Sequence, residues 1–310
     1  MFLSCGDSLF DLFVEADSEQ AEKVSLNGGP GGSPMNVAFG LARLGNKSSF
    51  LSPISNDLYA KRLREFLSRN KVDLSLCPQT DRNTTLAIIE KNQDGSAEYV
   101  FYLEGAADTG LQISELPNPL PATVKFLHFG SYSTVIEPTA SALKQLAKQA
   151  NGKALISYDP NLRLSIQPSL KVWKETFEHF TSVASVVKAS DEDIAGLFGV
   201  GGEDEFVEAC LKAGSELVFI TRGPDGGSAF SNNGAEAHSR GYKVDVVDTV
   251  GAGDTFQAFL LHYLGQYATG STVPGIAEID LATCLDTALK AAAITCTRHG
   301  ADLPTFSDLD

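Results

Sequence analysis

Short apolar runs alternate with helix-like patterns along most of the 310-residue chain. Apolar runs of strand length occur at 2–5, 124–129, 154–158, 185–188 and 217–221. Segments with helical spacing lie between and after them, at 137–150, 170–180, 203–213, 252–267 and 280–297. A further helix is expected after a glycine cluster, with Ser33 as N-cap, Pro34 as first helical residue and Gly45 at its end. This alternation predicts an α/β protein with a mostly parallel sheet and helices on both faces.

One segment departs from this rhythm. Residues 84–91 and 98–103 are rich in β-forming side chains and flank a turn that contains Asp94-Gly95. This pattern favours a β-hairpin over another strand–helix–strand unit. A hairpin inserted early in an α/β domain is suited to form a lid, and an ordinary hairpin at a sheet edge is the alternative.

Composition and charge narrow the class of protein. With 43% hydrophobic and 20% charged residues the chain is typical of a globular protein, and a net charge of -15 argues against nucleic-acid or anionic membrane partners. The five cysteines are far apart and form no C-x-x-C pair, which favours free thiols in a reducing compartment. Asp7 and Asp11 follow an N-terminus without a basic region, so no signal peptide is expected. We expect a cytoplasmic protein.

The segment with the clearest chemical pattern spans residues 247–256. A strand is expected to end at Val247 and to run into a loop of small residues that opens a long helix. Small residues let the backbone approach a ligand closely, and unpaired N–H groups at a helix start attract anions. Asp254 in the first turn would repel a bound phosphate, so it is better explained as a base that takes a proton from an attacking hydroxyl. A helix cap is the simpler alternative.

A second glycine-rich segment, at 27–38, also opens a helix. Its four glycines suggest backbone placed against a small polar ligand, and Asn36 offers both a donor and an acceptor one turn into the helix. The spacing matches neither a dinucleotide fingerprint nor a phosphate-binding loop, since Gly152-Lys153 is followed by alanine. A flexible turn remains the alternative.

Three further polar segments, at 157–163, 188–191 and 221–227, come where strands are expected to end. Ligands of open α/β sheets bind beyond the carboxyl ends of the strands. Each segment alone has a plain explanation, such as a solvated charge at Lys188 or a glycine turn. Together they place polar and small residues repeatedly at one edge of one sheet.

These residues resemble a known family. Segments 28–45 and 248–256 resemble the N-terminal and C-terminal signatures of the ribokinase-like (PfkB) carbohydrate kinases, and 158–163 and 221–227 look like the fructokinase branch. The resemblance extends from Gly6 to Gly300. It implies one domain over 1–310 with a ribokinase-like three-layer αβα fold, a mostly parallel central sheet, and a small inserted β lid formed from about 12–26 and 84–107.

The resemblance also implies an activity. It would be ATP-dependent phosphorylation of a sugar hydroxyl, with D-fructose to D-fructose 6-phosphate as the first expectation. A kinase for another sugar such as 2-keto-3-deoxygluconate, or for a nucleoside, is the alternative within enzymes. A catalytically silent regulatory protein is the alternative outside them, although Gly251, Gly253 and Asp254 are all present.

Positions in the two signatures imply roles for individual residues. Asp254 would be the catalytic base, Arg163 would face the substrate or its phosphoryl group, and backbone amides would form the anion hole, at Gly251, Ala252 and Gly253. The sugar would be held by Asp11, Gly31, Gly32, Asn36 and Asp254. ATP and hydrated Mg²⁺ would be bound by Lys188, Asp191, Thr221, Gly223, Gly251 and Gly253.

Three finer expectations follow from the same resemblance. Relatives often hold a monovalent cation beside the anion hole, and here K⁺ would involve Asp248, the carbonyl of Val250 and the region of Gly300. Relatives commonly carry an arginine near the lid where this chain has Leu103, which bears on the charge of the substrate. A homodimer formed through the lid is also expected on this basis.

Overall fold

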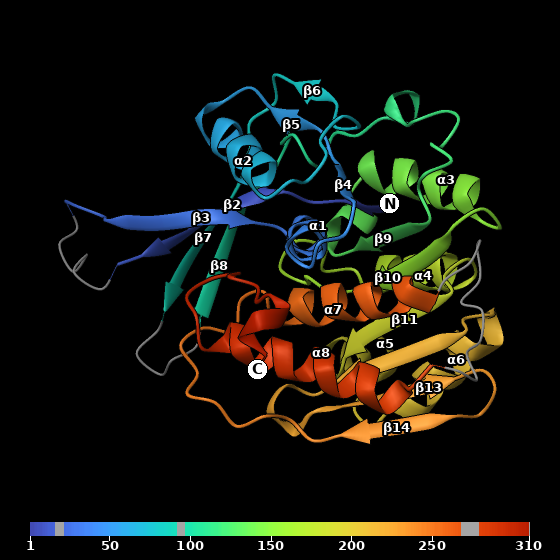
Figure 1. Cartoon of the computed structure of the whole chain (residues 1–310). Helices are drawn as coiled ribbons and strands as arrows, with labels where there is room; N and C mark the ends of the chain where they lie inside the picture. Colours follow the sequence, from blue (N-terminus) through green and yellow to red (C-terminus); the bar gives the residue numbers. More distant parts are fainter. Residues whose placement is uncertain (16–21, 92–96, 268–278, 310) are drawn as a thin grey trace.

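A computed structural model describes residues 1–15, 22–91, 97–267 and 279–309 (Figure 1). The turn expected at Asp94-Gly95 lies outside these residues. An eight-stranded sheet forms the centre, with the order β14 (Glu236–Ser239), β13 (Gly227–Ser231), β12 (Leu217–Thr221), β11 (Val186–Ser190), β10 (Leu155–Asp159), β9 (Phe126–Gly130), β1 (Phe2–Cys5) and β4 (Ser48–Leu51). The strands from β12 to β4 are parallel, and β13 and β14 are antiparallel to their neighbours.

Successive residues of the parallel strands point into two separate hydrophobic cores. Leu3, Leu127 and Ile156 belong to one core, whereas their neighbours Phe2, Phe126 and Leu155 belong to the other. A strand buried on both faces in this way must be covered by helices on both sides. The expected three-layer αβα arrangement is confirmed.

The helices divide between the two faces of the sheet. The first core is covered by α3 (Thr139–Ala150), α4 (Leu170–Thr181), α5 (Asp191–Phe198) and α6 (Glu203–Ala213). The second is covered by α1 (Ser33–Arg43), α7 (Ala252–Tyr267) and α8 (Leu281–Cys296), with α7 packed against both α1 and α8. The helix α5 was not predicted, and the predicted bounds of the other six agree with the structure to within two residues at each end.

A second sheet projects from one side of the molecule (Figure 1). It has four strands, in the order β3 (Leu26–Gly31), β2 (Leu9–Val14), β7 (Thr85–Lys91) and β8 (Ala97–Tyr102). The β7–β8 hairpin is confirmed. The strands β2 and β3 extend beyond the range 12–26 at both ends, so the glycine run 28–31 is a strand and not a free loop. One face of this sheet packs on α2 (Leu58–Arg69) through a third core that includes Phe10, Leu12 and Leu63.

Smaller elements complete the described chain. Strands β5 (Ile54–Ser55) and β6 (Gln79–Thr80) form a two-stranded sheet, and short 3-10 helices occur at η1 (Ile113–Glu115), η2 (Tyr132–Thr134), η3 (Gly223–Asp225) and η5 (Phe306–Asp308). In the described part of the chain, no helix has the length and apolar character that crossing a membrane requires.

Two local predictions were wrong. No strand ends at Val247: residues 240–247 form no ladder, and the N–H of Val247 bonds instead to the carbonyl of Cys296 at the end of α8. Val246 and Val247 are exposed, so their β-branched side chains do not mark a buried strand. Ser33 is not the N-cap of α1 either, because the helix begins at Ser33 and Gly32 takes the cap position.

Candidate active site

The start of α7 carries backbone N–H groups that have no partner. Among the described residues, no hydrogen bond is made by the N–H of Gly251, Gly253 or Asp254. Gly251 has a φ of 81°, and a Cβ there would lie 2.7 Å from Cβ of Ala301, so only glycine fits this turn. Unpaired N–H groups at the positive end of a helix form a binding place for an anion.

Asp254 is fixed from the neighbouring helix α1. Its Oδ1 accepts a hydrogen bond from Oγ of Ser33 (2.7 Å) and its Oδ2 accepts one from Nδ2 of Asn36 (2.8 Å). Burial raises the pKa of Asp254, although these two hydrogen bonds and the charges of Lys188 and Arg163 oppose the rise. The carboxylate therefore does not cap its own helix. It is a buried acid, held in one orientation and able to accept a proton.

Asp11 lies on β2 of the four-stranded sheet, opposite Gly29 of β3. A Cβ on Gly31 would lie 2.1 Å from Oδ2 of Asp11, so the carboxylate occupies the space that the glycine leaves open. Burial, and then the charge of Asp254, raises the pKa of Asp11 to about 7. Asp11, Gly31, Asn36 and Asp254 are thus brought together, with Gly32 as the cap that joins β3 to α1.

Lys188 is buried within β11, and this excludes the solvated charge that its sequence context allowed. Its Nζ lies 2.9 Å from Oδ2 of Asp159 on the adjacent strand β10. A Cβ built on Gly253 would lie 3.3 Å from the same Nζ. The ammonium group therefore touches the first turn of α7.

The loop before α7 is tied to the end of α8. Oδ1 of Asp248 accepts from the N–H of Val250 (3.1 Å), and Oδ2 accepts from the N–H of Gly300 (3.0 Å). The carbonyl of Cys296 accepts from the N–H of Val247 and of Asp248. A carboxylate and backbone carbonyls held this close together are suitable oxygen ligands for a monovalent cation.

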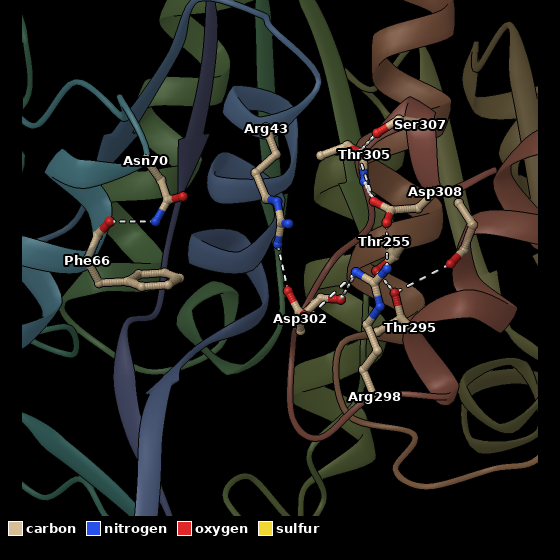
Figure 2. A network of polar contacts seen from close by, with 11 residues as sticks. Arg43, Phe66, Asn70, Thr255, Thr295, Arg298, Asp302, Thr305, Ser307 and Asp308 are labelled. Atoms are coloured by element: carbon tan, nitrogen blue, oxygen red, sulfur yellow. Dashed lines mark hydrogen bonds and ion pairs between the residues drawn. The ribbon is translucent and has the colours of Figure 1, made fainter. Parts of the chain in front are cut away.

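Ion pairs hold the segment 298–302 in place (Figure 2). Asp302 pairs with Arg43 of α1 at 2.6 Å and with Arg298 at 3.5 Å, and Arg298 also pairs with Asp308 at 2.9 Å. Beside them, the hydroxyls of Thr255 and Thr295 lie 2.7 Å apart and join α7 to α8. We call the side chains of Arg43, Arg298, Asp302 and Asp308 the C-terminal clamp.

A cleft of about 910 Å³ opens between the four-stranded sheet and the loops described above. Its lining includes Asp11, Gly28 and Gly29 from the sheet and Asp248 and Gly300 from the opposite side. Asp11 from the expected sugar site and Asp248 and Gly300 from the expected cation loop therefore face one cavity. The other expected sugar-binding residues are not part of its lining: Gly31, Gly32, Asn36 and Asp254.

The remaining expected residues lie along the same edge of the large sheet. Thr221 ends β12 and pairs in register with Ser190, directly before the exposed Asp191 at the start of α5. Gly223 begins η3. Within the described residues no hydrogen bond or ion pair joins Asp191, Thr221 or Gly223 to the Asp254 group, so they form a separate, neighbouring cluster.

Arg163 lies in the loop after β10, and its Nη1 donates to the carbonyls of Leu162 (2.9 Å) and Asn161 (3.4 Å). Its charge acts on both Asp11 and Asp254, since it opposes the rise that burial causes in the pKa of each. Arg163 therefore belongs to the same electrostatic environment as the proposed base.

Sequence reasoning missed three residues of this environment. Ser33 was interpreted as a helix cap, and its hydroxyl instead orients Asp254. Asp159 ends β10 and had no role of its own. Asp7 is buried and accepts from the N–H of Ser33 (3.1 Å); burial, and then the charge of Asp108, raises its pKa to about 7. The signal for Asp7 and Asp159 was an acid directly at a strand end, which is hard to separate from a solvated loop residue.

Comparison with known proteins places this geometry in a family. The model of the "pfkB family carbohydrate kinase" matches residues 2–307. A protein of Arabidopsis thaliana named probable fructokinase-5 is 32% identical over 314 residues, which covers 99% of this chain and 95% of the relative.

Solved structures agree with this assignment. The fructokinase of Xylella fastidiosa with bound ATP has the same fold, with a TM-score of 0.89 at 22% identity, covering 99% of this chain and 96% of that one. The fructokinase of Vibrio cholerae O395 in its fructose, ADP and calcium ion bound form is 25% identical, with a TM-score of 0.84, 99% of this chain covered and 97% of the other. The chain belongs to the pfkB family of carbohydrate kinases.

Proposed function

We propose that this protein is a fructokinase, which transfers the γ-phosphoryl group of ATP to the 6-hydroxyl of D-fructose. The observation that carries the proposal is the start of α7. There a buried carboxylate, fixed by two hydrogen bonds from α1, lies beside unpaired backbone N–H groups and a buried ammonium. The relatives named above support fructose as the sugar.

The geometry suits phosphoryl transfer, which needs mainly positioning and charge stabilisation. Asp254 accepts the proton of the attacking hydroxyl, and burial raises its pKa, which makes it a stronger base than an exposed aspartate. The free amides of Gly251 and Gly253 stabilise charge on the transferring group without any movement of side chains. The N–H of Ala252, also expected in the anion hole, donates to the carbonyl of Thr249 (3.3 Å). Lys188 and Arg163 supply positive charge that acts on Asp254.

The sugar is held opposite this helix start. Asp11 accepts hydrogen bonds from sugar hydroxyls, and the backbone of Gly31 and Gly32 allows close approach. Nδ2 of Asn36 is used by Asp254, so its amide oxygen remains for the sugar. These groups suit a neutral sugar, because each of them can form a hydrogen bond with a hydroxyl group. A sugar without charge needs no oppositely charged side chain in the site.

The nucleotide and its ions belong along the neighbouring edge of the large sheet. Thr221 and Gly223 line the nucleotide, and the exposed carboxylate of Asp191 is able to hold the water shell of Mg²⁺. Mg²⁺, when bound, neutralises phosphate charge. K⁺ fits the oxygen-rich loop of Asp248, Val250 and Gly300, where it would keep the start of α7 in place.

The four-stranded sheet acts as the lid of this single domain. It carries Asp11 on the face that lines the cleft, so the sheet and the sugar approach the catalytic residues together. A cleft of about 910 Å³ exceeds what one monosaccharide fills, and closure of the sheet would expel the remaining water. Exclusion of water keeps ATP from hydrolysis.

A coupled kinase assay over a panel of sugars tests the proposal. With ATP and Mg²⁺, fructose should give the highest kcat/KM, above 2-keto-3-deoxygluconate, other hexoses and a nucleoside. Phosphorus NMR of the product should place the phosphate on carbon 6. Preference for another acceptor would overturn the substrate, and absence of turnover with every acceptor would overturn the kinase activity.

The lid also offers a surface for a second copy of the chain. Val100 and Tyr102 of the edge strand β8 and Leu26 of the edge strand β3 are large apolar side chains with 45–61% of their surface exposed. Burying such side chains between two copies stabilises a dimer. Sedimentation of the wild type and of Tyr102→Asp measures this: the wild type should be dimeric and the variant monomeric.

The proposal places the enzyme in the cytoplasm. All five cysteines are free thiols, and three of them are buried. A reducing compartment suits this state. Fractionation of cells with an antibody against the protein checks the compartment.

A further inference from the structure

A buried ion pair lies beneath the start of α7. Nζ of Lys188 and Oδ2 of Asp159 are 2.9 Å apart, and the two side chains are 5% and 2% exposed. Lys188 is the one side chain of the described residues that bonds to the carboxylate of Asp159, whose second oxygen is buried without a partner. Asp159 is therefore dedicated to the lysine.

Fold stability does not explain this pair. Moving two charges out of water is costly, and well-packed apolar residues of similar size stabilise a core at least as well as a buried ion pair. Phe219 of β12 pairs in register with Lys188, on the same face of the sheet, and is apolar and completely buried. A pair kept at this place needs another reason.

The position of the ammonium provides one. It lies 3.3 Å from where a side chain on Gly253 would begin, so it touches the turn whose N–H groups are unpaired. Lys188 also acts electrostatically on Asp254, whose pKa it lowers against the larger effect of burial. A charge at this point adds to the anion-binding field of the helix start only if it is held still.

We propose that Asp159 is a positioning residue for phosphoryl transfer, which holds the ammonium of Lys188 against the first turn of α7. The inference rests on the proposed kinase function, in which Lys188 supports the phosphates. Asp159 itself touches neither sugar nor nucleotide and acts through the lysine. Because Asp159 holds the ammonium of Lys188, this positive charge is already in place when the transferring group acquires negative charge.

The protonation of Lys188 depends on the same carboxylate. Burial alone would lower the pKa of Lys188, but Asp159, then Asp193 of α5 and Asp254 of α7, outweigh it and leave the pKa raised. His128 of β9 also lies near the ammonium; its pKa is lowered to about 3, mainly by burial, so it stays neutral. Without the charge of Asp159, a buried lysine loses its proton at a lower pH, by up to several units.

The test is the pH profile of kcat for Asp159→Asn. At pH 7 we expect kcat to fall by about tenfold or more, with KM for the sugar nearly unchanged, because charge beside the transferring group is displaced. Between pH 7 and 9.5 the variant should lose further activity, while the wild type stays nearly constant. A structural defect alone would lower kcat by one factor at every pH, and that result would overturn the proposal, as would wild-type kcat.

Asp193→Asn is the matched control. Asp193 is also buried and lies near Lys188, but its carboxylate accepts from the N–H of Leu162 and from Ser190 and does not bond to the lysine. It should give a smaller loss of kcat and no comparable loss at high pH. In a Lys188→Met background, Asp159→Asn should have little further effect on kcat, because its role passes through the lysine. Equal losses in both backgrounds would contradict this.

Two additional measurements keep the test decisive. If Asp159→Asn does not fold, Asp159→Glu keeps the charge but displaces the ammonium. It should lower kcat about tenfold with no new loss at high pH, and a wild-type rate would refute the proposal.

If the wild type phosphorylates no sugar, the proposed function fails, and calorimetry with a non-hydrolysable ATP analogue still tests the ion pair of Lys188 and Asp159. Affinity should fall between pH 7 and 9.5 in Asp159→Asn and not in the wild type, and equal pH dependence would overturn it.

Discussion

The start of α7 and the four-stranded sheet each contribute a carboxylate to the candidate site, Asp254 and Asp11, but the two regions are built differently. Around Asp254, the next three residues Thr255, Phe256 and Gln257 are almost completely buried, and the carboxylate is held from α1. On the sheet, Tyr99, Val100 and Tyr102 of β8 are 42–61% exposed. Asp11 therefore stands on an element with much of its surface in water.

The contrast separates two tasks. A base and an anion hole work best when they are fixed before the substrate arrives, and tight packing provides this. A sugar-binding carboxylate on a less enclosed sheet can move with the sheet, so recognition is coupled to closure. Changes at α7 should therefore act on kcat, and changes on the sheet should act on the affinity and choice of sugar.

The largest effect on kcat is expected at the start of α7. Asp254→Asn should lower kcat by roughly 10²-fold or more, because the proton of the sugar hydroxyl loses its acceptor. Steady-state kinetics and thermal unfolding measure it, with the exposed Asp245→Asn as a matched control in the preceding loop. A variant that keeps more than about a tenth of wild-type kcat would rule out Asp254 as the base.

On the sheet, Asp11→Ala should act mainly on sugar affinity. A hydrogen bond to a charged acceptor contributes roughly 1.5–3 kcal/mol, so the Kd for fructose should rise about 10- to 100-fold. Calorimetric titration measures this, and the affinity for ATP serves as the internal control. Unchanged fructose affinity would show that Asp11 does not contact the sugar.

Leu103, just beyond β8, sharpens the choice of substrate. Leucine cannot form the paired hydrogen bonds by which arginine binds a carboxylate, and an unpaired carboxylate under a closed lid loses hydration. We expect kcat/KM for fructose to exceed that for 2-keto-3-deoxygluconate at least about tenfold, or about 1.4 kcal/mol. Leu103→Arg should reduce the ratio of kcat/KM for fructose to kcat/KM for 2-keto-3-deoxygluconate. A wild-type preference for the acid sugar would reverse the assignment.

Removal of K⁺ tests the role of the loop that precedes α7. A cation bound by Asp248 and the carbonyl of Val250 would hold the anion hole, so replacing K⁺ by a bulky organic cation should lower kcat several-fold at constant ionic strength. Na⁺ is a useful intermediate case. Identical rates in the three salts would remove the cation from the mechanism.

A smaller effect is expected on the pH dependence of the free energy of unfolding, through the buried Asp7. Asp7 lies between β1 and β2, and its pKa is raised to about 7 by burial and by Asp108. The native state then binds a proton that the unfolded chain has already released, so stability should fall as pH rises from about 4 to about 7. Asp7→Asn should flatten the decrease of Tm between pH 5.5 and 8. Parallel Tm curves for the two proteins would contradict this.

The sequence predicted five of the eight strands of the large sheet, missing β4, β13 and β14, and predicted the second sheet only in part. Strands such as Leu217–Thr221 are short apolar runs between turn signals, and their type follows from the pattern itself. The strand Leu26–Gly31 escaped prediction because glycine and proline disfavour strands, and here pairing with β2 decides the conformation. Tertiary pairing of this kind leaves no local trace.

The site was predicted as a set of residues but not as a set of contacts. Asp254 and Asn36 lie where small-residue segments open helices, which the residues alone indicate, whereas the role of Asp11 was implied by the family resemblance. The orientation of Asp254 by Ser33 joins positions 221 residues apart, and the buried Lys188 pairs with Asp159 of another strand. Neither fact can be read from spacing within one segment.

The C-terminal clamp has a practical consequence for engineering the protein. Asp308 holds Arg298, so a fusion partner or a protease cut close to Asp308 would disturb the segment that carries Gly300 and, through it, Asp248. Met1 directly precedes β1, at the amino-terminal ends of the parallel strands, and its ammonium group donates to the carbonyl of Thr123. An affinity tag or an immobilisation linker should therefore be joined before Met1, where it is separated from the reacting groups by the full length of the parallel strands.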